Sequence, residues 1–323
     1  MIEEHGARSG LTGLIAGVHA VTRSIADACD VPDLALTVVV TGDITASVRE
    51  RSQVERDFTP ERSGGIVKGK TISLARDFSE TAIIIDTSGM SVGGEEAVDQ
   101  VEFLHLILHE CGHVLIGRLR AAAGTRPPKP DRIQTPEEVA TVWAYEAADE
   151  FRCDLLSNML LGQFITVSSK DGKSRPLTIA DVLGEGYRDA FADHLEQVHP
   201  GWPDLVDARL ANEINLEEMY DALLLEAGAI LKLIAHADAV EQASGMEPLL
   251  NGFAGHPAVQ LLLGPVWRPI RAVVETALLP PLADFAAADE AVQRCGQQIV
   301  AMWGSLGVTA HLTHGDELYV SVS

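Results

Sequence analysis

The segment from Glu95 to Arg120 constrains the fold more than any other part of the chain. A helix over these residues carries large apolar side chains nearly all the way round, so it has to be buried on every side. A chain of 323 residues is long enough to enclose such a helix in a substantial core. The apolar residues of this predicted helix are Val101, Phe103, Leu104, Leu106, Ile107, Leu108, Val114, Leu115 and Ile116.

Strands and further helices are predicted on both sides of this segment. The sequence Thr135-Pro136-Glu137-Glu138 combines an N-cap, a proline at the first helical position and a capping-box glutamate, so it opens a helix. That helix follows a proline-rich, exposed loop and runs to about Leu161. In chain order we expect a helix at 11–29, strands at Leu34–Thr41, Ile66–Ala75 and Thr81–Asp86, the buried helix, the loop Gly124–Gln134 and the second long helix.

The C-terminal half is rich in Ala and Leu and is predicted to be mainly helical. A turn is expected around Asp171-Gly172, helices from Thr178 to Ser305, and a short β tail in the last fifteen or so residues. Breaks in the helices are expected where proline and glycine interrupt the pattern. These positions are His199-Pro200-Gly201, Gly245–Pro248, Gly264-Pro265 and Pro280-Pro281.

The buried helix contains the sequence His109-Glu110-Cys111-Gly112-His113. His109 and His113 are four residues apart, so both imidazoles lie on one helix face and can bind one metal ion. Glu110 lies next to the first ligand, where it reaches a metal-bound water rather than the metal. This HExxH pattern is typical of zinc hydrolases, in which the glutamate is the general base. The alternative is a metal-free helix with two core histidines and an ion-paired glutamate.

A catalytic zinc needs a third protein ligand and an open position for water. Ile116 and Leu119 stand where metzincins have Gly and His, so we expect an acid from the next helix. Glu146, Glu150 and Asp154 lie four residues apart on one face of that helix. We predict that Glu150 binds zinc and that Asp154 orients a ligand histidine through its second ring nitrogen. The alternatives are Glu146 as ligand with Glu150 behind it, and an ordinary solvated acidic face.

Strands that lead into an HExxH helix, followed by a helix with Glu150, Phe151 and Leu155-Leu156, resemble the ImmA/IrrE family of metallo-endopeptidases. The resemblance covers roughly residues 66–162. The pair Glu150 and Asp154 is also similar to that of other gluzincins, such as the HtpX-like peptidases. Members of the ImmA/IrrE family cleave or inactivate a repressor, and their motif residues correspond to His109, Glu110 and His113.

Together these features predict an α+β fold with a zincin-like domain over residues 1–165 and a mainly helical region over 166–323. The expected function is hydrolysis of peptide bonds by water activated on zinc, with Ile66–Ala75 or Thr81–Asp86 offering a strand edge to an extended peptide. One alternative is a non-catalytic zinc-binding interaction or sensor module on the same scaffold, and another is a helical interaction protein without metal. Glu110 favours the enzyme, because binding alone does not require a base.

Charge and cysteine content narrow the partners and the compartment. Lys and Arg number 24 against 47 Asp and Glu, which gives a net charge of −23. Such a surface disfavours nucleic acid and membrane surfaces as partners and favours a basic protein or peptide as substrate. The four cysteines form no CxxC pair, and no apolar run reaches the length of a membrane span. We therefore expect a soluble cytoplasmic protein.

Several other side chains are candidates for the same site. His105 lies one turn before His109, and the sequence allows either a role behind the ligands or an ordinary core position. Cys111 and Cys153 are interpreted as buried small residues. A side chain that stabilises the oxyanion is expected opposite the metal, and the candidates are Tyr145, Tyr187, His194 and His236.

Overall fold

The computed structural model describes residues 2–5, 12–28, 34–52, 58–62, 65–88, 96–125, 135–168, 172–183, 186–276, 285–312 and 318–323. The fold is mixed α+β and mostly helical, and it forms two compact units that alternate along the chain. The sheet unit comprises Met1–Thr125, Arg152–Gly184 and Leu279–Phe285. The helical unit comprises Arg126–Phe151, Glu185–Leu278 and Ala286–Ser323.

The sheet unit contains a four-stranded sheet in the order β1–β2–β6–β5. β1 (Ile2–His5), β2 (Ala35–Thr41) and β6 (Glu80–Asp86) are parallel, and β5 (Gly69–Ser73) is antiparallel to β6. β6 lies between two neighbours, so the expectation that Thr81–Asp86 offers an edge is wrong. Within the described part of the chain, β5 is the outermost strand on that side.

The two faces of the sheet are covered by different helices, because side chains alternate between faces along a strand. One face packs on α1 (Thr12–Ala28), α3 (Glu96–Ala123) and the second half of α4 (Pro136–Phe164) through a large apolar core. The other face packs on α2 (Ile44–Arg51), whose core residues join Val39, Ile72 and Ile84 of the strands. The buried character predicted for the HExxH helix is confirmed. The remaining elements of this unit are β3 (Glu61–Arg62), β4 (Gly65–Ile66), β7 (Thr166–Ser168), β8 (Ser174–Pro176) and α5 (Ala180–Leu183).

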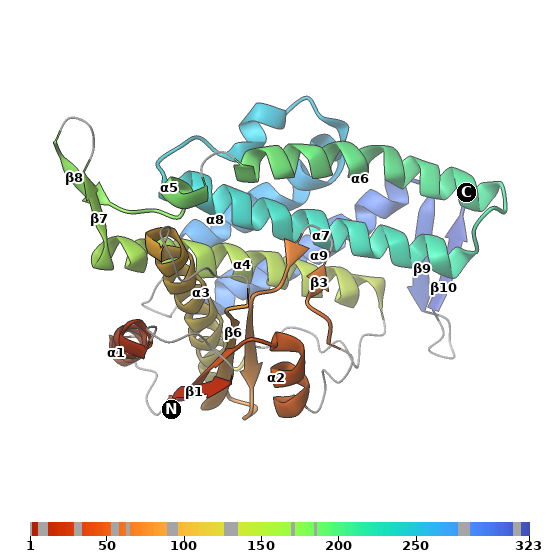
Figure 1. The fold of residues 1–323 in the computed structure, drawn as a ribbon. Coiled ribbons are helices and arrows are strands. Elements are labelled where there is room, and N and C mark those ends of the chain that lie inside the picture. The colour runs from red at the N-terminus through yellow and green to blue at the C-terminus, as the bar shows by residue number, and fades with distance from the viewer. Residues whose placement is uncertain are drawn as a thin grey trace. The chain divides into compact units, whose positions relative to one another are not determined.

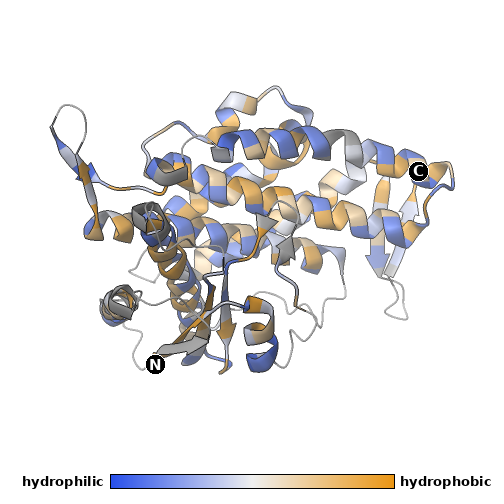
Figure 2. Cartoon of the chain, viewed as in Figure 1, coloured by the Kyte–Doolittle hydropathy of each residue, from blue (hydrophilic) through white to orange (hydrophobic). Residues whose placement is uncertain are grey.

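The helical unit contains the first half of α4 and a series of helices that ends in a β-hairpin. α6 (Gly186–Leu210) and α7 (Leu216–Ala243) lie side by side (Figure 1). Hydrophobic residues recur along α7 with hydrophilic residues between them, as expected for a helix with one buried face (Figure 2). The other elements are the 3₁₀ segment η2 (Leu249–Phe253), the π-helical segment η3 (Val259–Trp267), α8 (Arg268–Thr276), α9 (Phe285–Ser305), β9 (Val308–Leu312) and β10 (Leu318–Val322).

Most predicted elements of the C-terminal half are confirmed, but two of the predicted helix breaks are wrong. α6 continues through His199-Pro200-Gly201 without a break. Trp202, which is completely buried, and the apolar face around it favour one continuous helix over the local preference of proline and glycine. The break at Gly245 is confirmed. The break predicted at Gly264-Pro265 is wrong, because both residues lie inside the π-helical segment η3, which continues directly into α8. Pro280-Pro281 and most of the predicted Gly124–Gln134 loop lie outside the described residues.

Three other differences concern the N-terminal half. β1 and α2 have no counterpart among the predicted elements, and the predicted strand Ile66–Ala75 is divided into β4, which pairs with β3, and β5.

The predicted capping box is confirmed, since Thr135 Oγ1 accepts from the Glu138 amide at 3.1 Å and the Glu138 carboxylate accepts from the Thr135 amide at 3.0 Å. Among the helices described, none combines the length and apolar character that a bilayer crossing requires.

Candidate metal centre

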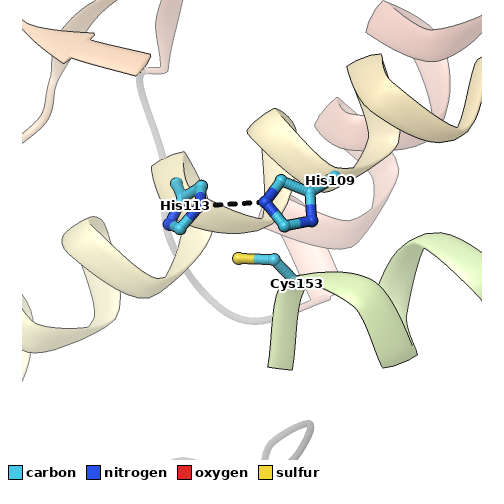
Figure 3. Close-up of side chains that lie close together, drawn as sticks. All are labelled: His109, His113 and Cys153. Carbon is cyan, nitrogen blue, oxygen red and sulfur yellow. Dashed lines mark hydrogen bonds between the residues drawn. The ribbon is translucent and has the colours of Figure 1, made fainter. Parts of the chain in front are cut away.

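Three potential metal donors meet where α3 and α4 lie against each other. The ring nitrogens of His109 and His113 and the Sγ atom of Cys153 all lie within 4.8 Å of one another (Figure 3). His109 and Cys153 are buried, and His113 is half-buried. A buried group of two imidazoles and one thiol is therefore able to bind a metal ion, and zinc is among the ions that accept this donor set.

The two imidazoles are oriented toward a common point. His109 Nε2 and His113 Nε2 are 3.2 Å apart. Two nitrogens that each lie about 2.0–2.1 Å from a tetrahedral zinc are separated by roughly 3.3 Å. The two side chains thus have the spacing of two ligands of one tetrahedral zinc ion.

Asp154 fixes the orientation of the first histidine. Its Oδ1 atom lies 2.6 Å from His109 Nδ1, and both side chains are buried. A proton on Nδ1 donates to the carboxylate, so the Nε2 lone pair is directed toward His113. The predicted contact of Asp154 with a histidine of the motif is therefore present, and the role of His109 as a metal ligand stays a prediction.

His105 extends this polar contact along α3. The Ser157 hydroxyl lies 2.9 Å from the Asp154 carbonyl oxygen, to which it donates, and 2.9 Å from His105 Nδ1. His105 Nε2 then lies 3.5 Å from Asp154 Oδ1. His105 therefore lies behind His109, as one of the two sequence-based interpretations proposed.

Glu110 lies apart from the group of donors and against strand β5. The Thr71 hydroxyl donates to Glu110 Oε2 at 2.6 Å, and the carboxylate is buried. A Cβ atom on Gly69 would come within 2.6 Å of Glu110 Oε1, so the strand has to carry a glycine for the carboxylate to keep this position. β5 and α3 together hold the Glu110 side chain in one place.

The turn between β5 and β6 is fastened to α3 one to two turns beyond the motif. Phe78 has a left-handed backbone with φ of 60°, and its ring lies where a Cβ on Gly117 would come within 2.5 Å. Arg118 Nη1 donates to the Asp77 carbonyl at 3.0 Å and pairs with its carboxylate at 3.2 Å. These contacts fix β5 along the HExxH helix.

The outer side of β5 presents backbone groups next to Glu110. The Asp86 amide donates to Lys68 O and the Leu74 amide donates to Glu80 O, which makes these the bonded pairs of the ladder. Bonded pairs alternate in an antiparallel ladder, so the N–H and C=O groups of Gly69, Thr71 and Ser73 point away from β6.

Glu146 and Glu150, the first two acids of the predicted zinc-binding face of α4, have partners within the helical unit. Glu146 forms an ion pair with Lys232 at 2.6 Å, and Glu150 Oε2 lies 3.9 Å from His236 Nε2. Glu150 is the less exposed of the two carboxylates, at 20% against 41%. Its role as a zinc ligand stays a prediction.

The other residues singled out from the sequence lie in the helical unit or in the core. The Tyr145 hydroxyl donates to the Asp289 carbonyl at 3.1 Å. Burial raises the pKa of Tyr187 and lowers the pKa of His194. Cys111 Sγ accepts from the Thr22 hydroxyl at 3.0 Å, and burial raises the pKa of this thiol to about 12, so it stays protonated and inert.

Cys153 is the residue that sequence reasoning set aside, because it has no regular spacing to the histidines. Gly112, inside the motif, was the available signal. A Cβ at this position would lie 2.9 Å from Cys153 Sγ and 3.1 Å from its Cα atom. The missing side chain of Gly112 is thus what lets α4 bring the thiol this close.

Comparison with known proteins adds no relative: no family model, no curated protein and no solved structure matches this chain.

Proposed function

We propose that the chain is a zinc-dependent peptidase of the zincin type. The main support for this proposal is that the two histidines and the glutamate of the HExxH motif have different positions. The His109 and His113 nitrogens converge at 3.2 Å, whereas the Glu110 carboxylate is held by Thr71 outside the donor group. Two ligands and a separate, positioned carboxylate are what hydrolysis by metal-activated water requires.

In this proposal His109 and His113 bind zinc, and α4 supplies a further ligand. Zinc in such a site polarises a substrate carbonyl and acidifies water. Glu110 takes the proton of the attacking water and passes it to the leaving amine nitrogen. Thr71 keeps the carboxylate oriented through its hydroxyl at 2.6 Å, and Asp154 keeps His109 in the tautomer that binds.

The edge of β5 suits an extended peptide as substrate. The backbone groups of Gly69, Thr71 and Ser73 point away from β6, and an added strand would pair with them beside Glu110. The charge of −23 favours basic substrates, a DNA-binding repressor among them, through an attraction that weakens as salt rises.

The test combines metal analysis with proteolysis. Purified protein should carry about one zinc, and His113→Ala should lose it, because the remaining ligands cannot close a site. With unstructured peptides of mixed sequence, cleavage should be fastest for basic ones at low ionic strength. Glu110→Gln should keep zinc and lose about 10²–10⁴-fold in rate, as expected when a general base is removed.

Glu102→Gln is the matched control, because Glu102 is on the same helix and its carboxylate pairs with Lys68 at 2.8 Å. This variant should cleave like the wild type. If wild type and Glu110→Gln behave alike with every peptide while zinc is bound, the chain is a zinc-binding interaction or sensor module. A wild type that takes up no zinc overturns the proposal.

A further inference from the structure

Within the described residues, Cys153 completes the one group of three metal donors that the structure brings together. We propose that Cys153 binds the metal as a thiolate and is the third protein ligand, supplied by α4. This inference rests on the metal site of the proposed function and names a ligand that the sequence pattern does not.

The position of the thiol is fixed by its surroundings. Cys153 is completely buried on the face of α4 that meets α3, at the point where Gly112 has no side chain. The next residue, Asp154, is 2.6 Å from His109 Nδ1, so it holds α4 in register with α3 at this level. Two adjacent residues of α4 thus lie close to His109: the Asp154 carboxylate contacts Nδ1, and the Cys153 thiol belongs to the donor group. Figure 3 shows Cys153 beside the two imidazoles.

The separation of the donors is close to what a metal requires. With Zn–S of about 2.3 Å and Zn–N of about 2.0–2.1 Å, a tetrahedral site separates sulfur and nitrogen by roughly 3.6 Å. The donors lie within 4.8 Å of each other, so closing the site shortens a sulfur–nitrogen separation by roughly 1.2 Å at most.

The burial of Cys153 gives the metal a second role. A thiolate with no exposure to water is costly unless a cation lies beside it. On binding, the thiol releases its proton to solvent and the sulfur electron pair bonds to the cation. The negative charge of the resulting thiolate is then balanced by the cation. Three protein ligands then leave one coordination position for water, which is the arrangement of catalytic zinc sites.

Cobalt(II) is the probe, because a thiolate bound to this ion gives an intense near-ultraviolet charge-transfer absorption that imidazole and carboxylate ligands do not give. The full chain is stripped of metal and titrated with cobalt(II). The wild type should develop this absorption in proportion to the cobalt bound. Cys153→Ser and Cys153→Ala should lose it, and their affinity should fall by more than the roughly 10–100-fold expected for loss of an outer partner.

Cys111→Ser is the matched control, since Cys111 is another buried cysteine next to the same histidines but its sulfur accepts from Thr22. This variant should keep the absorption. A wild-type cobalt complex without the absorption, or an absorption that persists in both Cys153 variants, overturns the proposal. The wild-type spectrum decides the question even if a variant does not fold.

The outcome is separable from that of the proposed function. If cobalt binds without thiolate absorption and the zinc form cleaves peptides, Cys153 is not a ligand and the peptidase proposal stands. If cobalt and zinc do not bind at all, both proposals fall.

Discussion

Replacing Gly112 by alanine tests the close approach of α3 and α4 on which the metal centre depends. The new Cβ atom would lie 2.9 Å from Cys153 Sγ and 3.1 Å from the Cys153 Cα atom. The second of these is a backbone atom, so a change of side-chain rotamer cannot relieve the overlap. Gly17 in α1 is the matched control, because it is also a helical glycine of the sheet unit and a Cβ atom added there would meet nothing within 4 Å.

The two substitutions share one energetic effect and differ in the other. Alanine is favoured over glycine in a helix by about 1 kcal/mol, so Gly17→Ala should stabilise the fold by about that amount. At Gly112 the same gain is opposed by an overpacking cost of about 1–3 kcal/mol. We therefore expect Gly112→Ala to be about 1–3 kcal/mol less stable than Gly17→Ala, whatever the absolute stability of the chain.

Zinc affinity should differ between Gly112→Ala and Gly17→Ala more than unfolding stability does. Displacement of α4 moves Cys153 and Asp154 away from His109 together, so zinc affinity in Gly112→Ala should fall by at least about tenfold. Urea unfolding of the metal-free proteins measures stability, and competition with a chelator measures affinity. If Gly112→Ala is as stable as Gly17→Ala and binds zinc like the wild type, the two helices do not meet as described.

Three further predictions address other parts of the molecule. Asp154→Asn should reduce zinc affinity by about 10–100-fold in the same competition assay, because it weakens the contact with His109; unchanged affinity would contradict the orienting role. Thr71→Val should lower the cleavage rate while zinc content stays at the wild-type value, because both described hydrogen bonds of the hydroxyl go to Glu110, one to its backbone and one to its carboxylate; loss of zinc would instead place Thr71 in the metal site. Burial lowers the pKa of His194 below its unfolded value of about 6.5, so the unfolded chain binds the proton first and stability should fall as the pH drops below 6.5. His194→Gln should flatten that part of the urea-midpoint profile between pH 7 and 5, and an unchanged slope would remove His194 as its source.

The sequence alone was sufficient to predict features that depend on hydrophobic periodicity or on a short local motif. The all-round apolar pattern predicted the buried α3, and the capping residues Thr135 and Glu138 predicted the start of α4 within one residue. The HExxH spacing placed two imidazoles on one face, which the 3.2 Å distance between His109 and His113 reflects.

Other features depend on contacts between segments, which neither periodicity nor a short local motif reveals. The approach of Cys153 to the histidines depends on the register of two helices, and neither helix shows that register in its own pattern. α2 is short and mostly polar in sequence, and it is held by the Asp43 cap on the Ala46 amide and by the Ser47 hydroxyl on Thr41. Burial of Trp202 decided the continuity of α6 against its proline.

The order of the strands along the chain also has a consequence for how the protein acquires its native structure. β5 and β6 are joined by residues 74–79 alone, whereas β2 pairs with β6 across residues 42–79. Closing the short connection loses much less chain entropy, so the β5–β6 hairpin should form early and the parallel pairing of β2 should follow more slowly. Since Phe78 and Asp77 in that hairpin also contact α3, we expect docking of the hairpin to bring Thr71 to Glu110 before the sheet is complete. A mutation that slows folding in β2 would then delay the native state without altering how the Glu110 carboxylate acquires its position.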